Sequence, residues 1–195
     1  MDQELLKVLL VDSDSGRAAL LSQALQDQGY EVIASVNPGP NLLAVIAQNM
    51  PDVVVVDTES PNRDMLESVS LLNEHNPLPV VMFAEDDSDV VVREAISSGV
   101  SGYVARNTNP ERVKTIMKVA IARFREFQAL KSELTEVKSE LEKSKLLQKA
   151  KSLLMNVKGA TEDEAHQAIQ KMSMEQNKSV TQICEDIINV LELKI

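Results

Sequence analysis

The sequence predicts an α/β domain built on a five-stranded parallel sheet, then a long coiled-coil helix, then a small all-α bundle of three helices. Short apolar runs alternate with segments of helical spacing over residues 5–105, as in parallel sheets covered by helices. No glycine or proline occurs between Pro110 and Gly159, so one helix can run through that stretch. Two capping-box sequences then open two further helices.

The strands are predicted at five short runs rich in valine, isoleucine and leucine. These are Leu5–Val11, Tyr30–Val36, Val53–Asp57, Pro79–Ala84 and Ser101–Ala105. The third run is four valines and an aspartate, which is typical of a strand buried on both faces. An acid at the carboxyl end of such a strand lies where open α/β sheets bind their ligands, so Asp57 is the first candidate functional residue.

The long helix is predicted to carry a coiled-coil seam. Apolar residues recur at alternating spacings of three and four, the a/d pattern of a coiled coil, at Phe127, Leu130, Leu134, Val137 and Leu141. A single amphipathic helix packed on its own domain would show the same pattern. A homodimer explains the seam better, because the pattern continues beyond the α/β domain.

The last segment is predicted to form the helical bundle. Apolar positions from Leu146 to Val157 make one helical face, and Gly159 ends that helix. Capping boxes at Thr161 and Ser179 open the other two helices. Their predicted buried residues are Ala165, Ala168, Ile169 and Met172 in the second helix and Ile183, Ile187, Val190 and Leu191 in the third. The predicted domains are therefore residues 1–121, a linker over 122–145, and residues 146–195.

Charge is distributed unevenly along the chain. Residues 1–120 contain 8 basic and 18 acidic side chains, whereas residues 139–195 contain 8 and 9. The first domain would repel a polyanion, so any nucleic-acid contact is expected in the C-terminal part. The single cysteine, Cys184, excludes an intrachain disulfide and fits a buried position. No signal-peptide or membrane-span pattern is present, so we expect a cytoplasmic protein without membrane contact.

Residues 143–158 carry five lysines and no acidic residue. A lysine run usually forms a solvated helix face, and no aromatic residue in this stretch offers a stacking platform for bases. Charge by itself therefore leaves nucleic-acid binding and a merely solvated face equally open.

The runs LLVDSD, VVVVD, PVVMFA and SGYVAR, in this order, resemble the receiver domain of bacterial response regulators, which has a flavodoxin-like fold. The resemblance implies an acidic pair and a third-strand aspartate that together hold Mg²⁺, with the aspartate accepting a phosphoryl group. Asp12 matches the first acid, and Asp57 matches the phosphoacceptor. Ser13 replaces the second acid, Ala84 replaces a hydroxyl residue that grips the phosphoryl oxygens, and Arg106 replaces a lysine.

These departures leave two interpretations of the receiver site. In the first, the domain is an inherited scaffold, because Ser13 supplies no charged ligand and Ala84 supplies no hydroxyl. In the second, Asp57 is still phosphorylated, and Asp12 and Asp57 hold Mg²⁺ weakly. No other cofactor is expected.

Three C-terminal stretches, KAKSLLM, GATEDEAHQAI and KMSMEQNKSV, resemble the ANTAR domain, the three-helix RNA-binding module of transcription antiterminators. The Ala150-Lys151 pair matches that family, whereas Ser152 replaces its usual glycine. The predicted RNA-binding residues are Ala150, Lys151, Ser152, Lys143, Lys149, Lys171 and Lys178. The lysines would contact phosphates, and the small residues would let a loop base approach the helix.

A receiver, a coiled coil and an ANTAR bundle in this order resemble the AmiR/NasT family of antitermination regulators, with NasT the nearer match. This resemblance implies binding to tandem stem-loops in leader RNA, which stops the terminator from forming. It also implies control by a ligand-sensing protein partner more than by phosphorylation, and a role in nitrate and nitrite assimilation or in amide catabolism, with nitrate assimilation the nearer match. The alternative is a phosphorylation-driven response regulator whose C-terminal helices bind a protein.

Two other classes find no support in the sequence. An enzyme is not expected, because neither His75 nor His166 has a nucleophile or a metal-ligand partner at motif spacing. A DNA-binding regulator needs a recognition helix that faces the major groove, whereas the last predicted helix carries three acids.

Overall fold

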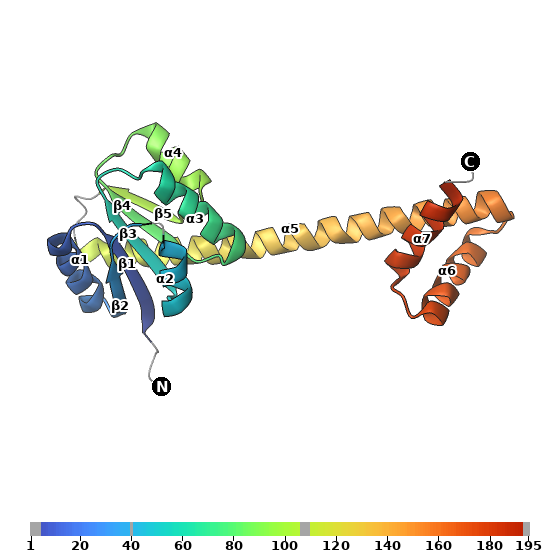
Figure 1. Cartoon of the computed structure of the whole chain (residues 1–195), viewed down its shortest axis with the longest axis horizontal. Helices are drawn as coiled ribbons and strands as arrows, with labels where there is room; N and C mark the ends of the chain where they lie inside the picture. Colours follow the sequence, from blue (N-terminus) through green and yellow to red (C-terminus); the bar gives the residue numbers. More distant parts are fainter. Residues whose placement is uncertain (1–4, 40, 106–109, 193–195) are drawn as a thin grey trace. The chain divides into compact units, whose positions relative to one another are not determined.

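The computed structural model describes residues 5–39, 41–105 and 110–192. Two compact units make up the chain, Met1–Gln128 (unit 1) and Ala129–Ile195 (unit 2). Helix α5, Pro110–Lys158, contributes to both units (Figure 1), so the expected boundaries at 121/122 and 145/146 fall inside one continuous helix. Within the described ranges, no helix combines the length and the apolar character that crossing a bilayer requires.

Unit 1 contains a five-stranded parallel sheet in the order β2-β1-β3-β4-β5. The strands are β1 (Leu6–Asp12), β2 (Tyr30–Val36), β3 (Val53–Thr58), β4 (Val80–Ala84) and β5 (Gly102–Ala105). The five predicted runs agree with them to within one residue at each end. The predicted α/β fold with a parallel sheet is therefore confirmed.

Helices cover both faces of this sheet, because successive side chains of a buried strand point to opposite sides. The helices are α1 (Ser15–Asp27), α2 (Leu42–Asn49), α3 (Arg63–His75), α4 (Asp89–Ser97) and the first part of α5. Along β1, Val8 and Leu10 pack with residues of α1 and α5, whereas Leu9 and Val11 pack with residues of α2, α3 and α4. Each of these four side chains is fully buried and stabilises the fold by roughly 1.5–3 kcal/mol.

The strand order reverses beside β1, and this reversal sets the position of the candidate functional residues of unit 1, Asp12 and Asp57. The chain leaves β1 for β2 at one edge and then crosses to β3 on the other side of β1. Asp12 and Asp57 lie in register at the carboxyl ends of β1 and β3. Open α/β sheets form their binding crevice at this kind of switch point.

Unit 2 consists of the C-terminal part of α5 together with α6 (Glu162–Gln176) and α7 (Val180–Glu192). Helix α5 ends at Lys158, and Gly159 follows with a φ of +66°, a left-handed conformation that glycine adopts without strain. The core of the bundle is formed by Ala150, Leu154, Ala165, Ile169, Ile183, Cys184 and Ile188. The predicted three-helix bundle and the buried position of Cys184 are confirmed, and burial raises the pKa of the Cys184 thiol.

One residue predicted to be buried in α7 is exposed. Val190 is 55% exposed, whereas Ile188, which was not predicted to be buried, is 7% exposed. At about 100° per residue, the buried face of α7 is centred near Cys184 and Leu191, and Val190 lies at its edge. The burial prediction for Val190 is therefore wrong, because the packing of α7 on the bundle turns its inner face away from that residue.

The predicted capping box closes the N-terminus of α6. The Thr161 hydroxyl oxygen accepts a hydrogen bond from the Glu164 N–H at 3.3 Å, and the Glu164 carboxylate accepts one from the Thr161 N–H at 2.9 Å. We expect Thr161→Ala to lower the free energy of unfolding of unit 2 by about 1 kcal/mol, measured by urea denaturation. Thr135→Ala, at an exposed position within α5, is the control. An equal loss in both variants would contradict the assigned role of the cap.

This cap also makes the contribution of Glu164 depend on pH. The hydrogen bond from the Thr161 N–H lowers the pKa of Glu164 below its ordinary value of 4.5. A carboxyl group whose pKa is lower in the folded state stabilises the fold above the unfolded pKa and loses this effect as the pH falls through the folded pKa. The stability difference between wild type and Glu164→Gln should therefore be full at neutral pH, and it should be lost as the pH falls from 4.5 through the lower pKa that Glu164 has in the folded state.

Candidate functional site

Two acidic side chains are buried at the carboxyl ends of β1 and β3. Asp12 is 3% exposed and Asp57 is 7% exposed, and no other charged residue of the described chain is classed as buried. The two residues face each other in register on neighbouring strands, which lie about 4.8 Å apart in a sheet. Burying two carboxylates on neighbouring strands is unfavourable unless a positive charge or hydrogen bonds compensate for it.

Arg17 in the first turn of α1 supplies a positive charge. Its Nη2 donates a hydrogen bond to Asp12 Oδ1 at 2.9 Å, and its Nη1 lies 3.8 Å from Asp14 Oδ2. The hydrogen bond to Asp12, together with the negative charges of Asp12, Asp14 and Asp57, raises the pKa of the Arg17 guanidinium. Arg17 is therefore held as a permanent cation beside the buried acids.

No motif in the sequence pointed to Arg17, although one signal was available. It is the sole basic residue between Lys7 and Arg63, and it follows directly on the acidic loop after the first strand. Asp14 fixes its position, because the Asp14 carboxylate caps α1 and accepts hydrogen bonds from the backbone N–H groups of Gly16 and Arg17 at 2.8 and 2.9 Å.

The loops that follow β3 and β4 are tied to each other beside these acids. The backbone N–H groups of Glu85 and Asp86 both donate to the Glu59 carbonyl oxygen at 3.0 Å. The Ser60 hydroxyl donates to the Asp86 carboxylate at 3.1 Å. The Tyr103 hydroxyl donates to the Asp86 carbonyl oxygen, and burial raises the pKa of this phenol. Both loops are therefore held by backbone and side-chain hydrogen bonds.

The remaining predicted receiver residues place few polar side chains beside Asp12 and Asp57. Ala84 is fully buried and offers no hydroxyl to a phosphoryl oxygen, and Ser13 is exposed. Arg106 lies outside the described residues. Asp12 and Asp57 are thus brought together as predicted, but the side chain placed beside them is Arg17.

The donors of this pocket do not fit Mg²⁺, which requires close to octahedral coordination by oxygen. Asp12 Oδ1 accepts hydrogen bonds from Arg17 and from the Asp14 N–H, so only its Oδ2, which is buried without a hydrogen-bond partner, remains for a metal ion. The Glu59 carbonyl oxygen already accepts two backbone hydrogen bonds. Within the described ranges, no cluster of three or more His, Cys, Asp or Glu residues could hold a metal ion.

In unit 2, two of the predicted RNA-binding lysines form ion pairs with carboxylates of the same unit. Lys151 Nζ lies 2.7 Å from Glu162 Oε1, and its side chain is 16% exposed. Lys178 Nζ lies 2.7 Å from Asp186 Oδ2. The hydrogen bond from Lys151 lowers the pKa of Glu162. RNA phosphates would therefore have to displace a carboxylate from each of these two ammonium groups.

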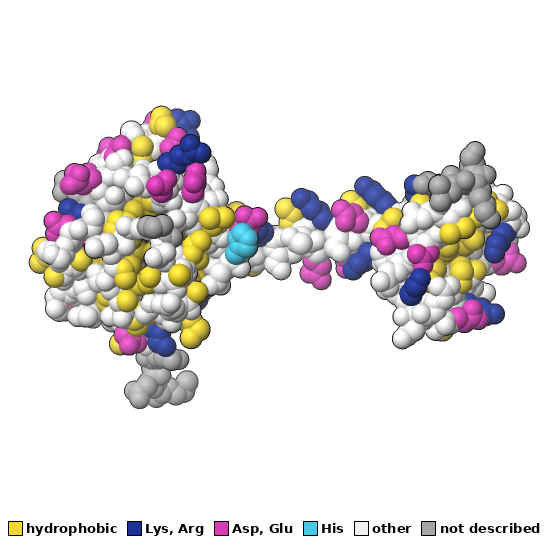
Figure 2. Space-filling model, viewed as in Figure 1, with side chains coloured by type: hydrophobic (Ala, Val, Ile, Leu, Met, Phe, Trp, Pro, Cys, Tyr) yellow, Lys and Arg dark blue, Asp and Glu magenta, His cyan; other side chains and the backbone are white. Residues whose placement is uncertain are grey.

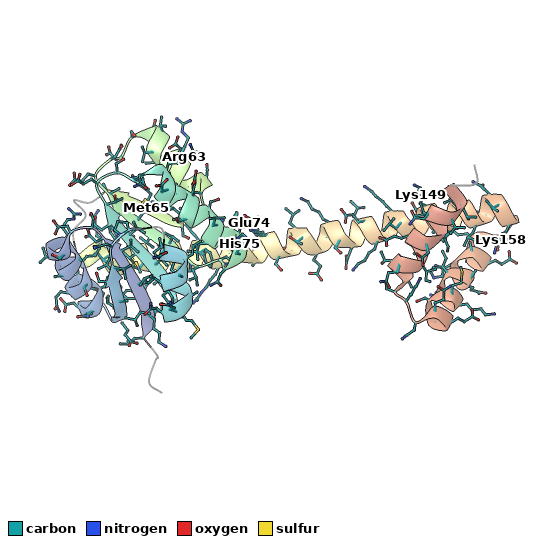
Figure 3. The ribbon with its side chains drawn as sticks, viewed as in Figure 1. Arg63, Met65, Glu74, His75, Lys149 and Lys158 are labelled. Atoms are coloured by element: carbon teal, nitrogen blue, oxygen red, sulfur yellow. The ribbon has the colours of Figure 1, made fainter. Side chains whose placement is uncertain are left out.

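Other predicted lysines are exposed on the surface of unit 2. They include Lys143 and Lys149 of α5 and Lys171 of α6, whose Nζ lies 3.8 Å from Glu175 Oε1. Lys149 and Lys158 are both on the C-terminal part of α5 (Figure 3). Basic and acidic side chains are interspersed over the visible face of unit 2 (Figure 2). The visible face of unit 2 therefore carries separate lysine side chains among acidic residues and is not uniformly basic.

The two small residues of the predicted RNA site differ in their surroundings. Ser152 is exposed, whereas Ala150 is fully buried in the core of the bundle. Because the Ala150 side chain packs inside the bundle, direct contact with a loop base at this turn would fall to Ser152. The approach of a loop base to this part of α5 stays a prediction.

The predicted coiled-coil seam forms an exposed apolar stripe on α5. Its residues are Phe127 at 57%, Leu130 at 59%, Leu134 at 54%, Val137 at 55% and Leu141 at 53% exposed. At about 100° per residue, Leu134 and Leu141 lie roughly opposite the buried Ala150 around the helix axis. The seam and the bundle core therefore occupy opposite faces of α5 within unit 2.

Both units match known protein families. Residues 8–118 match the response regulator receiver domain, and residues 135–188 match the ANTAR domain. The chain belongs to the response regulators that join a receiver to an ANTAR domain. This response regulator is 25% identical to the transcriptional regulatory protein PdtaR of Mycobacterium tuberculosis over 185 residues, which cover 95% of this chain and 90% of PdtaR. It is 24% identical to the DNA-binding response regulator MtrA of the same organism over 123 residues, 63% of this chain and 54% of MtrA.

Solved receiver structures share the fold of this response regulator. The chemotaxis response regulator CheY4 of Vibrio cholerae superposes with a TM-score of 0.52 at 28% identity, over 60% of this chain and 99% of CheY4. A LuxR-family two-component response regulator from Aurantimonas superposes with a TM-score of 0.56 at 19% identity, over 61% of this chain and 86% of that one. These similarities confirm the predicted receiver fold.

Proposed function

We propose that this response regulator is a transcription antitermination regulator, which binds paired stem-loops in leader RNA through its ANTAR domain and prevents the terminator from forming. The ANTAR match over residues 135–188 carries the proposal. The similarity to PdtaR, a transcriptional regulatory protein, over 95% of the chain supports it. The site of action is the cytoplasm, and the family resemblance alone points to nitrate assimilation, or else amide catabolism, as the regulated process.

The exposed seam of α5 supports a homodimer held by a coiled coil. Five large apolar side chains along one helix form a stripe that pairing with a second copy of the helix would remove from water. Because the bundle core lies on the opposite face of α5, the pairing would leave both bundles open to RNA. Two bundles in one dimer can hold two hairpins, and this raises the effective concentration of the second binding event.

The receiver pocket supports control by a ligand-sensing protein partner rather than by phosphorylation. Ala84 supplies no hydroxyl for a phosphoryl oxygen, and a guanidinium holds Asp12. In this proposal the partner binds the regulator and withholds it from RNA until the inducing ligand is present. Unit 1 then serves as the surface that the partner recognises.

RNA crosslinking in the native cells, followed by sequencing, tests the proposal. We expect paired stem-loops beside a terminator to be enriched with wild type and lost with Lys151→Ala. Absence of enriched RNA under inducing conditions would overturn it in favour of a signalling protein whose C-terminal helices bind a protein. In that case beryllofluoride with Mg²⁺ should change the oligomeric state of wild type but not of Asp57→Ala.

Glu162 is expected to compete with RNA for Lys151. Glu162→Gln should strengthen hairpin binding by about two- to fivefold at moderate salt, because it removes the carboxylate charge that pairs with Lys151 without removing the lysine. Fluorescence anisotropy with a labelled hairpin measures this change. Glu175→Gln removes the same charge beside Lys171, at the longer distance of 3.8 Å, and should have a smaller effect. Unchanged or weaker binding by Glu162→Gln would contradict a phosphate contact at Lys151.

A further inference from the structure

We propose that the Arg17 guanidinium takes the place of the divalent cation in the receiver pocket, so that unit 1 neutralises its buried Asp12 with the charge of a side chain and binds no Mg²⁺ there. The proposal stands on the arrangement of Arg17, Asp12 and Asp57 and goes beyond RNA binding by unit 2. Its first basis is the 2.9 Å ion pair between Arg17 Nη2 and Asp12 Oδ1, in which the Asp12 side chain has no exposed surface.

The position of Arg17 in its helix is a second basis. The first turn of a helix carries the positive end of the helix dipole, so a cation is disfavoured there unless it has a negative partner. Arg17 is the third residue of α1, and Asp14 at the N-cap holds its backbone N–H at 2.9 Å. The backbone is thereby fixed while the side chain reaches Asp12, which supplies the partner that the helix terminus requires.

The oxygen atoms of the pocket give a third basis. A divalent ion needs several oxygen ligands, and two oxygen atoms of the pocket already accept hydrogen bonds. Asp12 Oδ1 accepts two hydrogen bonds, and the Glu59 carbonyl oxygen accepts two more from the backbone. A divalent ion at Asp12 Oδ2, which is buried without a hydrogen-bond partner, would also be repelled by the guanidinium bound to the same carboxylate.

A consequence is that metal ions should neither stabilise nor destabilise unit 1. Removing the guanidinium would take away the cation bound to the buried Asp12 carboxylate, and a divalent ion could then bind there. Arg17→Ala should therefore create a metal site that wild type lacks. The double variant Asp12→Asn, Arg17→Ala should lose that site again, because the amide carries no charge.

Mn²⁺ titration of the full-length protein, with free Mn²⁺ counted by electron paramagnetic resonance, tests the proposal. We expect no saturable Mn²⁺ site in wild type and none in the double variant. Arg17→Ala should show one site per chain, with an affinity about tenfold or more above any residual Mn²⁺ binding by wild type. Arg63→Ala removes the exposed Arg63–Glu67 ion pair of α3 and should behave as wild type. Equal Mn²⁺ binding by wild type and Arg17→Ala would overturn the proposal.

Thermal unfolding of wild type gives a second measurement that needs no variant. We expect the same unfolding midpoint for unit 1 in EDTA and in millimolar Mg²⁺. A midpoint that rises with Mg²⁺ and saturates at one ion per chain would overturn the proposal even if Arg17→Ala does not fold. Neither result depends on RNA binding by unit 2.

Discussion

Leu134→Asp is expected to convert the proposed dimer into a monomer and to weaken binding of RNA that carries two stem-loops by about 10²-fold or more. Leu134 lies in the middle of the seam and is 54% exposed on α5. In a coiled coil this position would be buried against its counterpart, where two aspartates would be desolvated and would repel each other. Analytical ultracentrifugation measures the oligomeric state, and anisotropy with one-hairpin and two-hairpin RNAs measures affinity.

The one-hairpin RNA separates dimerisation from direct RNA contact. Its affinity should be the same for Leu134→Asp and wild type, because each bundle retains its own surface. Glu133→Gln, at an exposed position of α5 outside the seam, should leave both the dimer and its affinity unchanged. A Leu134→Asp protein that remains dimeric, or that loses affinity for one hairpin as strongly as for two, would disprove the seam as the source of two-site binding.

Ile169→Ala is expected to lower the free energy of unfolding of unit 2 by about 2–5 kcal/mol. Ile169 is fully buried between helices of a small bundle, and small cores have little stability to lose. Unit 2 should therefore unfold at lower urea concentration than in wild type, while the transition of unit 1 stays in place. Urea denaturation followed by circular dichroism shows the two transitions, and hairpin binding should be lost once unit 2 is unfolded.

Met174→Ala on the same helix is the matched control. Met174 is 82% exposed, so its truncation should change stability by less than about 0.5 kcal/mol. If Ile169→Ala costs no more than Met174→Ala, the assignment of Ile169 to the core of unit 2 is incorrect. If it shifts the transition of unit 1 as well, the two units are energetically coupled.

Most of the fold could be predicted because it depends on local patterns. The strand at Val53–Thr58 was predicted to within one residue, since an unbroken apolar run of this length is typical of a strand covered on both faces. The continuous helix Pro110–Lys158 followed from the absence of breakers, and its end from Gly159. The capping box at Thr161 was equally clear, because both of its partners lie within four residues.

The candidate sites could be predicted only in part. Asp12 and Asp57 were expected together from the resemblance to receiver domains, and the structure places them in register at the carboxyl ends of neighbouring strands. The partner of Asp12 was missed, since Arg17 belongs to no motif of residue types and spacing. Lys151 was expected at the surface, yet Glu162, which is distant in sequence, holds it.

The sequence by itself determined the order of strands and helices, the helix ends and the apolar seam, because each follows from residues that are neighbours along the chain. Only the tertiary structure decided that a guanidinium is held at the buried acids, that Ala150 lies in the core and that Val190 lies at its edge. These features depend on how separate elements pack against one another. The spacing of apolar residues along one helix predicts which face is buried, with an error of about one residue position. This precision is too low to predict which side chains of other elements a given residue contacts.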